Sequence, residues 1–182
     1  MGQPLLRAWR RPETWQRRRA WRWRPGGGCS RSPSLGVQGG TPDVPLATLR
    51  VTTSSRTSVH PIGRQIQAAI EGKVRRDCLL LVSVPHTTCA VTLNEPEPGL
   101  LDDFARALER LIPWDGDYAH NQGAEDNAAA HVRANLIGHQ VLLPVTAGRL
   151  QIGVWQDVLL VECDGPRSRT VDIRLLADPD SS

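Results

Sequence analysis

At about residue 45 the sequence changes from a segment without hydrophobic periodicity to one in which strand-like and helix-like patterns alternate. Residues 1–44 hold four of the six tryptophans, five prolines and a run of three glycines, and no apolar periodicity persists there over a full window. Without apolar side chains placed to share one face, such a segment cannot build a core. We therefore expect a single folded domain at residues 45–178, followed by a short tail at 179–182.

The positive charge of the chain is concentrated in the same N-terminal segment. Nine arginines against two acids give residues 1–44 a net charge of +7, so the total of +3 leaves −4 for the remaining residues. A mildly acidic domain gives no electrostatic reason to expect nucleic acid as a partner. Residues 1–44 have three interpretations: a targeting peptide, a basic arm for nucleic acid or membrane, or an upstream extension without function. We favour the last and expect a disordered extension.

The periodicity after residue 45 predicts an α+β domain with three helices and a mainly antiparallel or mixed sheet. Alternating or β-branched runs predict strands at 46–52, 78–84, 88–94, 139–145, 153–162 and 169–176. Apolar residues at helical spacing predict helices at 63–70, 100–112 and 127–137, the last with Asp126 as its N-cap. Because the elements alternate without a regular βαβ repeat, an α+β fold is favoured over a parallel sheet.

Several classes of protein are excluded at this level. No run approaches the roughly 18 to 20 apolar residues of a membrane-spanning helix, and no apolar segment follows the first basic residues as in a secretory signal. We therefore expect a cytoplasmic protein without a membrane partner. The four cysteines are too widely spaced for a structural zinc site or a disulfide-stapled domain. Phosphate loops, nucleophile elbows, dinucleotide fingerprints and His-Glu-x-x-His pairs are absent from the sequence.

Three histidines are the first candidates for a site. His86 lies between two predicted strands, His120 in a polar loop, and His131 near the start of the third predicted helix. Three converging imidazoles can hold a divalent metal such as zinc and leave a position open for water or substrate. Spacing alone does not establish convergence, and the alternative is a surface or hydrogen-bonded structural role for each. His139 is expected to be an ordinary residue.

A second candidate cluster lies on or beside the last two predicted strands. Arginines presented from rigid strands suit bidentate capture of phosphate or carboxylate, although solvent-facing charge is an equal alternative. The cluster contains Arg149, Gln151, Trp155, Gln156, Arg167 and Arg169. Trp155 either stacks on a ring-containing ligand or is buried at a subunit interface. Glu162 ends an apolar strand, where an acid is costly unless paired, so we expect an ion pair with Arg167 or Arg169.

Five stretches of the predicted domain resemble the YjbQ family of small uncharacterised proteins. They are PHTTCAVTLNE at 85–95, DYAH at 117–120, AHVRANLIG at 130–138, GRLQIGVWQ at 148–156 and ECDGPRSR at 162–169. The order and spacing of the five stretches together are far more specific for this family than any one stretch alone. The resemblance covers about residues 47–176, and residues 1–44 have no counterpart in it.

This resemblance implies a homotrimer of compact α+β subunits and a label of secondary thiamine-phosphate synthase that rests on weak activity. The reaction would join hydroxymethylpyrimidine diphosphate to thiazole phosphate and release pyrophosphate. The ligands would be small phosphorylated metabolites, and a divalent ion, zinc or magnesium, would neutralise the diphosphate.

The resemblance also implies roles for individual residues. By position, it makes His86, His120 and His131 the catalytic or metal centre, with Asn94 and Glu95 beside them to orient them. It implies that phosphate oxygens are held by Arg149, Arg167 and Arg169, and that the pocket or trimer contact is shaped by Trp155 and Gln156.

Three departures from the family pattern bear on these roles. Asn121 stands where an acid often follows the histidine, which weakens the case for a tightly bound metal. Gln122-Gly123-Ala124 replaces a more usual Glu-Gly pattern, and Val154 stands where a threonine commonly precedes Trp-Gln. Two other functions stay open. One is a trimeric protein that binds a metal or phosphorylated metabolite without turnover. The other is a metal-dependent hydrolase with Glu95 or Glu125 as the base.

Overall fold

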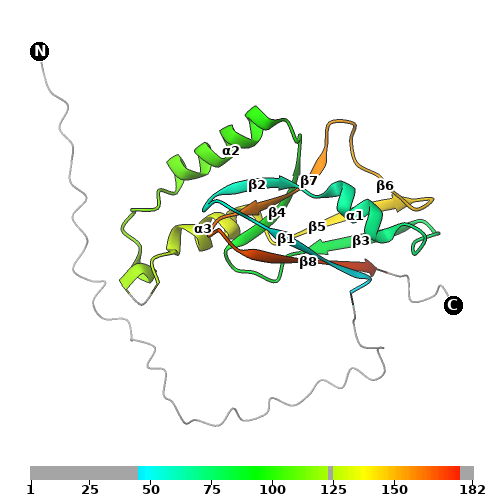
Figure 1. The fold of residues 1–182 in the computed structure, drawn as a ribbon, viewed down its shortest axis with the longest axis horizontal. Helices are drawn as coiled ribbons and strands as arrows, with labels where there is room; N and C mark the ends of the chain where they lie inside the picture. Colours follow the sequence, from blue (N-terminus) through cyan, green and yellow to red (C-terminus); the bar gives the residue numbers. More distant parts are fainter. Residues whose placement is uncertain (1–44, 123–124, 177–182) are drawn as a thin grey trace, which may run out of the picture. The chain divides into compact units, whose positions relative to one another are not determined.

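The computed structural model describes residues 45–122 and 125–176, so the predicted extension at 1–44 and the tail at 179–182 lie outside the described residues (Figure 1). The strands are β1 (Ala47–Thr52), β2 (Ser58–Pro61), β3 (Cys78–Ser83), β4 (Cys89–Asn94), β5 (Gln140–Thr146), β6 (Arg149–Leu150), β7 (Asp157–Glu162) and β8 (Ser168–Leu176). The helices are α1 (Gly63–Ile70), α2 (Pro98–Leu111), α3 (Ala128–Ile137) and the 3-10 helix η2 (Ala119–Gln122). No helix in this described part is long and apolar enough to cross a membrane.

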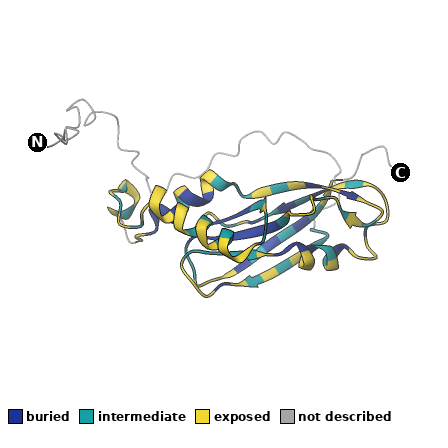
Figure 2. Ribbon diagram, turned by 90° about the horizontal axis from the view of Figure 1, so that it is seen from above, coloured by how far each residue is buried: buried dark blue, intermediate teal, exposed yellow. Residues whose placement is uncertain are grey.

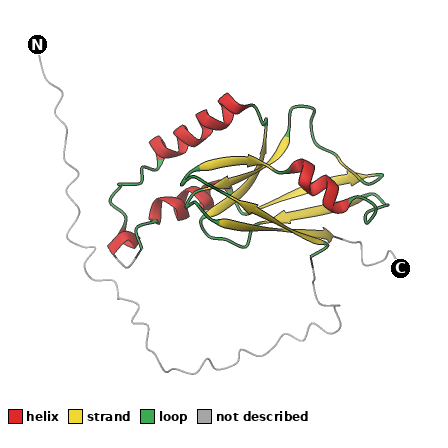
Figure 3. Ribbon diagram, in the orientation of Figure 1, coloured by secondary structure: helices red, strands yellow, loops and turns green. Residues whose placement is uncertain are grey.

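The strands form two antiparallel sheets, which confirms the predicted α+β class. The larger sheet has the order β1-β8-β3-β5-β6, and the smaller has the order β2-β7-β4 (strands labelled in Figure 1 and drawn in yellow in Figure 3). The short strands β2 and β6 were not predicted, because four and two residues are too few to show a period. The predicted strand at 153–162 begins only at Asp157, since residues 153–156 form a turn in which the Gln156 N–H donates to the Gly153 carbonyl.

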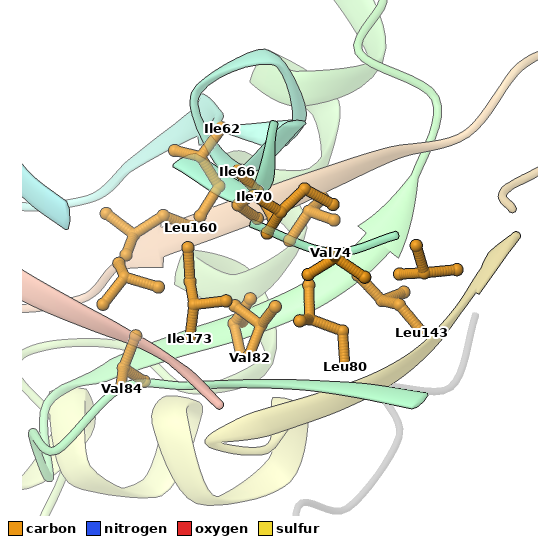
Figure 4. Close-up of a cluster of buried hydrophobic side chains, with 14 of the residues drawn as sticks. Ile62, Ile66, Ile70, Val74, Leu80, Val82, Val84, Leu143, Leu160 and Ile173 are labelled. Carbon is orange, nitrogen blue, oxygen red and sulfur yellow. The ribbon is translucent and has the colours of Figure 1, made fainter. Parts of the chain in front are cut away.

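The main core lies between the two sheets. Leu80 and Val82 of β3 and Ile173 of β8 face Leu160 of β7 across this layer (Figure 4). Helix α1 closes one side of the layer with the isoleucines that its periodicity predicted, Ile62, Ile66 and Ile70. Each fully buried side chain of this size stabilises the fold by about 1.5–3 kcal/mol. Alternation along the strands therefore directs one face of each sheet into a shared core.

The opposite face of the smaller sheet is covered by α2 and α3. Ala90 of β4 and Val161 of β7 pack there against Leu108 of α2 and against Ala130 and Ala134 of α3. The outward sides of these helices are exposed (Figure 2). Strand β7 is thus buried on both faces, which explains its continuous apolar run.

A buried ion pair joins the two sheets at one end of the core. By strand alternation, Glu162 of β7 follows Val158 and Leu160 into the core, and Arg169 of β8 precedes Val171 on the facing sheet. Both side chains are at least 95% buried, and the Arg169 Nε donates to Glu162 Oε2 at 2.7 Å. This confirms the predicted ion pair and identifies Arg169 as the partner. Arg167 pairs instead with Asp164.

Hydrogen bonds keep the carboxylate of this pair ionised. Burial alone would raise the pKa of Glu162, but donors from Arg169, from the Asp164 backbone and from the Thr53 hydroxyl lower it below its ordinary value. The stabilisation from this group is therefore present above about pH 4.3 and is lost as the pH falls through the folded-state pKa.

The ion pair generates the first prediction. Glu162→Gln leaves the Arg169 guanidinium buried without its charge partner, so we expect urea denaturation to show a loss of about 3–5 kcal/mol. The double variant Glu162→Leu with Arg169→Met removes both charges and is expected to lose less. The control is Asp103→Ala, which breaks the exposed Asp103–Arg106 pair and should cost about 0–1 kcal/mol. A Glu162→Gln loss no larger than that of the control would contradict the account.

Candidate functional site

A cleft of about 350 Å³ opens beside the ion pair, at the end of the sheets where β4 begins and β7 ends. Three connections form it: residues 85–88 between β3 and β4, residues 125–127 before α3, and residues 164–167 between β7 and β8. The last connection needs its glycine, because a Cβ on Gly165 would lie 2.1 Å from the Ser55 carbonyl oxygen. The cleft is lined by Pro85, His86, Thr87, Thr88, Glu125, Asn127, His131, Asp164, Arg167 and Arg169.

His86 is held against β8 by its Nε2 atom. The Thr170 backbone N–H donates to this nitrogen at 2.9 Å, and the Thr170 hydroxyl lies 3.1 Å from it. A nitrogen that accepts a backbone N–H carries no proton of its own, so neutral His86 has its proton on Nδ1. The fold therefore selects the tautomer that offers an Nδ1–H donor.

Burial and the neighbouring charge of Arg169 also keep this imidazole neutral. Desolvation lowers the pKa of His86 below its ordinary value, and the Arg169 guanidinium lowers it further, while the Glu162 and Asp172 carboxylates oppose the shift. The unfolded chain therefore binds a proton on His86 at a higher pH than the folded chain does. Lowering the pH from about 6.5 through the folded-state pKa of His86 consequently destabilises the fold.

A chain of polar side chains runs along the other wall of the cleft. The Asn127 amide Nδ2 donates to Glu125 Oε2 at 3.2 Å and to Asp164 Oδ2 at 3.1 Å. Arg167 donates from Nη2 to the same Asp164 oxygen and from Nε to the Asp164 carbonyl. Asn127 is buried, yet its Oδ1 has no hydrogen-bond partner within the described residues. A ligand or water that donates to this oxygen would therefore be stabilised.

The other two predicted histidines meet beside the cleft. The rings of His120 and His131 lie edge to face, with centroids 4.9 Å apart. Their approach depends on Asn121, whose Oδ1 accepts from the Ala128 N–H at the start of α3 and so holds η2 to that helix. The predicted N-cap at Asp126 is wrong: α3 starts after Asn127, and Asn121 supplies the side-chain acceptor instead.

The three histidines thus gather around one region, but they do not form a set of metal ligands. His86 Nε2 is occupied by the Thr170 N–H, and binding through Nδ1 would place a proton on Nε2 against that donor. In the described ranges, no group of three or more His, Cys, Asp or Glu side chains is placed to hold a metal ion. The described residues therefore do not fit a three-histidine metal centre.

The remaining predicted residues lie away from the cleft, and all but Arg149 lie at the opposite end of the smaller sheet. Cys89 pairs with Glu162 beside the cleft, whereas Asn94 pairs with Asp157 five residues further along, about 17 Å away at strand spacing. Asn94, Glu95, Trp155 and Gln156 belong to that far end, whereas Arg149 lies on β6 at the edge of the larger sheet. Within one chain Asn94 and Glu95 therefore do not orient the histidines.

Several residues of the cleft were missed in the sequence. Thr170 acts through its backbone N–H, which no residue pattern reveals, and Asn127 is recognisable only from its partners in space.

Burial raises the pKa of Cys89 and of Cys163 to about 12, so neither thiol is a nucleophile at neutral pH.

Comparison with known proteins places the chain and its fold in a family. The family described as UPF0047 protein YjbQ-like matches residues 47–178. The chain belongs to the YjbQ-like family. A UPF0047 protein of Archaeoglobus fulgidus is 41% identical over 128 residues, which is 70% of this chain and 98% of that protein. The UPF0047 protein YugU of Bacillus subtilis is 32% identical and covers 72% of this chain and 98% of its own length.

Solved structures of similar proteins share the fold. A hypothetical protein from Aeropyrum pernix matches with a TM-score of 0.70 and 37% identity, over 72% of this chain and 98% of that one. A YbjQ-like protein of unknown function from Sulfolobus solfataricus matches with a TM-score of 0.69 and 31% identity, over 72% and 96% of the two chains. The YjbQ-like fold of the domain is thereby established.

The histidine tautomer is the second prediction. Nitrogen-15 NMR of the imidazole rings should show His86 with Nδ1 protonated and Nε2 unprotonated at neutral pH, and with a titration midpoint below about 6.5. In the matched variant Thr170→Val the hydroxyl is lost but the backbone N–H remains, so the tautomer should not change. A proton on Nε2 of His86 in the wild-type protein would contradict this description.

Proposed function

We propose that this YjbQ-like protein binds a small phosphorylated metabolite in the cleft between His86, His131 and Arg167. The observation that carries the proposal is the fixed tautomer of His86, which leaves an Nδ1–H to donate to an anionic oxygen. Arg167 is half exposed, and only two of its five N–H groups are used by Asp164. A guanidinium with free N–H groups beside a neutral imidazole donor suits the oxygens of a phosphate.

Selectivity in this cleft comes from its acids as well as its donors. Asp164 and Glu125 both line it, so a free anion meets partial repulsion, and a ligand with its own donor groups is favoured. The unpaired Asn127 Oδ1 supports the same conclusion, since it can accept a hydrogen bond from an amino or hydroxyl group. The ligand is therefore proposed to carry both a phosphate and a hydrogen-bond donor.

The proposal includes a divalent metal ion, but only as one that binds together with the ligand. Because His86 does not fit as a ligand, we propose a divalent ion, magnesium rather than zinc, that enters with the phosphate groups. Carboxylate oxygens suit such a hard ion, and Glu125 and Asp164 are the acids of the cleft.

The reaction that the family resemblance suggests is the transfer of a hydroxymethylpyrimidine group from its diphosphate to thiazole phosphate, in a homotrimer. Arg167 and His86 would donate hydrogen bonds to the pyrophosphate oxygens and so stabilise the pyrophosphate as it leaves. Binding without turnover is the other outcome that an assay of these two compounds can give.

The third prediction concerns binding of the anion. Calorimetric titration of the full chain with pyrophosphate and magnesium should show binding that Arg167→Ala and His86→Ala each weaken about tenfold or more, because each removes a donor to an anion. Arg106→Ala is the matched control, since Arg106 is an exposed arginine of α2 and should leave the affinity unchanged. Equal affinities for the wild type and both cleft variants would overturn the proposal.

The contribution of metal is read from the same titrations. Chelator should weaken pyrophosphate binding without unfolding the protein, because the ion is proposed to arrive with the ligand. The assay with the pyrimidine diphosphate and thiazole phosphate then separates a transferase from a binding protein.

A further inference from the structure

A second cleft, of about 270 Å³, opens at the end of the larger sheet where β3 begins and β8 ends. We call it the basic cleft, and it is lined by Lys73, Val74, Arg75, Arg76, Cys78 and Leu175. Along β8, Leu175 lies six residues beyond Arg169 of the proposed ligand-binding cleft, about 20 Å away at strand spacing. The two clefts are therefore separate sites.

The floor of the basic cleft is apolar because it continues the main core. Val74 is buried in that core together with Leu80 and Leu143 (Figure 4). Leu175 pairs with Leu80 and so points to the same, core-facing side of the larger sheet, yet 40% of it stays exposed. An apolar group that entered the cleft would cover Leu175 and would itself be removed from water.

The rim of the basic cleft carries positive charge and no acid. Lys73, Arg75 and Arg76 are exposed, and in the part of the chain that the structure describes none of them forms an ion pair. Asp77 follows them, but it does not line the cleft, and its Oδ1 accepts from the Ala147 N–H. An anion bound among the three cations would relieve their mutual repulsion.

The backbone that presents these cations is held at both ends. The N–H groups of Lys73 and Val74 donate to the Ile70 carbonyl, which continues the last turn of α1. The hydrogen bond from Asp77 to the β5–β6 turn holds the other end. The same turn packs directly on the segment, because a Cβ on Gly148 would lie 2.9 Å from the Val74 carbonyl oxygen. With the backbone already ordered, binding costs mainly the conformational freedom of the cationic side chains.

We propose that the basic cleft binds a small anion that carries an apolar chain or ring. Its phosphate or carboxylate group lies between the Lys73 ammonium and the guanidinium groups of Arg75 and Arg76, and its apolar group lies against Val74 and Leu175. The ligand is a dissolved molecule rather than a lipid in a bilayer, because the apolar wall lies inside the cleft, on the core-facing side of the sheet. This inference concerns a second site and does not depend on the proposed function.

The cleft contains its own reporter of occupancy, the Cys78 thiol. Cys89 and Cys163 are buried, whereas Cys78 is partly exposed. Burial, and after it the charge of Asp77, raise the pKa of the Cys78 thiol, so it stays protonated at neutral pH and reacts slowly with alkylating reagents. A ligand that covers this thiol slows its alkylation further, and the change can be measured by mass spectrometry of the peptide that contains Cys78.

The fourth prediction is protection of Cys78 by octyl phosphate in the full chain. At saturating concentration, but below the concentration at which it forms micelles, octyl phosphate should slow alkylation of Cys78 by iodoacetamide about tenfold or more. Inorganic phosphate lacks the apolar chain and octanol lacks the charge, so each should change the rate less than about twofold. Equal protection by either of these two compounds would overturn the inference.

Matched variants test the charged rim. The triple variant Lys73→Gln, Arg75→Gln and Arg76→Gln removes the charges, keeps long side chains, and should abolish the protection by octyl phosphate. Arg64→Gln is the control and should keep it, because Arg64 is an exposed arginine of α1 that does not line the cleft. Protection that survives in the triple variant would overturn the inference.

A second pair of variants tests the apolar floor. Leu175→Ser should weaken octyl phosphate binding about tenfold or more, because it removes the apolar wall. Leu176→Ser should leave the affinity unchanged, since Leu176 is similarly exposed but lies on the opposite face of β8. Equal affinities for the two variants would contradict the proposed pose.

Further measurements separate this site from other occupants. Protection should persist in Arg167→Ala, which disables only the proposed ligand-binding cleft, and its loss there would contradict a separate site. Protection by phosphatidylglycerol vesicles but not by octyl phosphate would identify a membrane surface instead. Faster alkylation after removal of residues 177–182, with no protection by octyl phosphate, would identify that segment, which contains Asp178 and Asp180, as the occupant. Either result would overturn the inference.

Discussion

The buried pair between Glu162 and Arg169 is the interaction on which the other features of the domain depend. It links the two sheets at one end of the core, and Thr53 and the Asp164 backbone complete the hydrogen bonds of the carboxylate. Arg169 also donates to the Thr88 hydroxyl and carbonyl, which ties the β3–β4 connection to β8. Leaving either buried charge without its partner is strongly destabilising, so both residues of the pair stay in place. The loops that are hydrogen-bonded to the pair, and that form the cleft, are held with it.

The chemistry of the cleft follows from that anchor. With Arg169 held in place, the next residue of β8 presents its backbone N–H to His86 and sets the tautomer. Burial, and after it the same guanidinium, lower the pKa of the imidazole, so the ring remains a neutral donor. One network of hydrogen bonds thus has both a structural and a functional role. A substitution of Arg169 that is meant to disturb the ligand site would also break the ion pair between the two sheets.

The fold class, the three helices and a paired Glu162 could be predicted because they follow from local periodicity and from the cost of burying an acid. The meeting of His120 and His131 was implied by the family resemblance and did not follow from their spacing. Strand register was not readable from the sequence, which is why Asn94 and Glu95 were placed beside the histidines when β4 carries them to its other end. Whether His86 can bind a metal was unreadable for a similar reason, since a backbone N–H from a distant strand decides which ring nitrogen is available.

The most direct test of the account is a crystal structure of the full chain with pyrophosphate and magnesium near neutral pH. The account predicts a phosphate oxygen within hydrogen-bond distance of His86 Nδ1 and of the Arg167 guanidinium, with His86 Nε2 still accepting the Thr170 N–H. A metal ion coordinated by His86, or an anion bound elsewhere while this cleft stays empty, would contradict it.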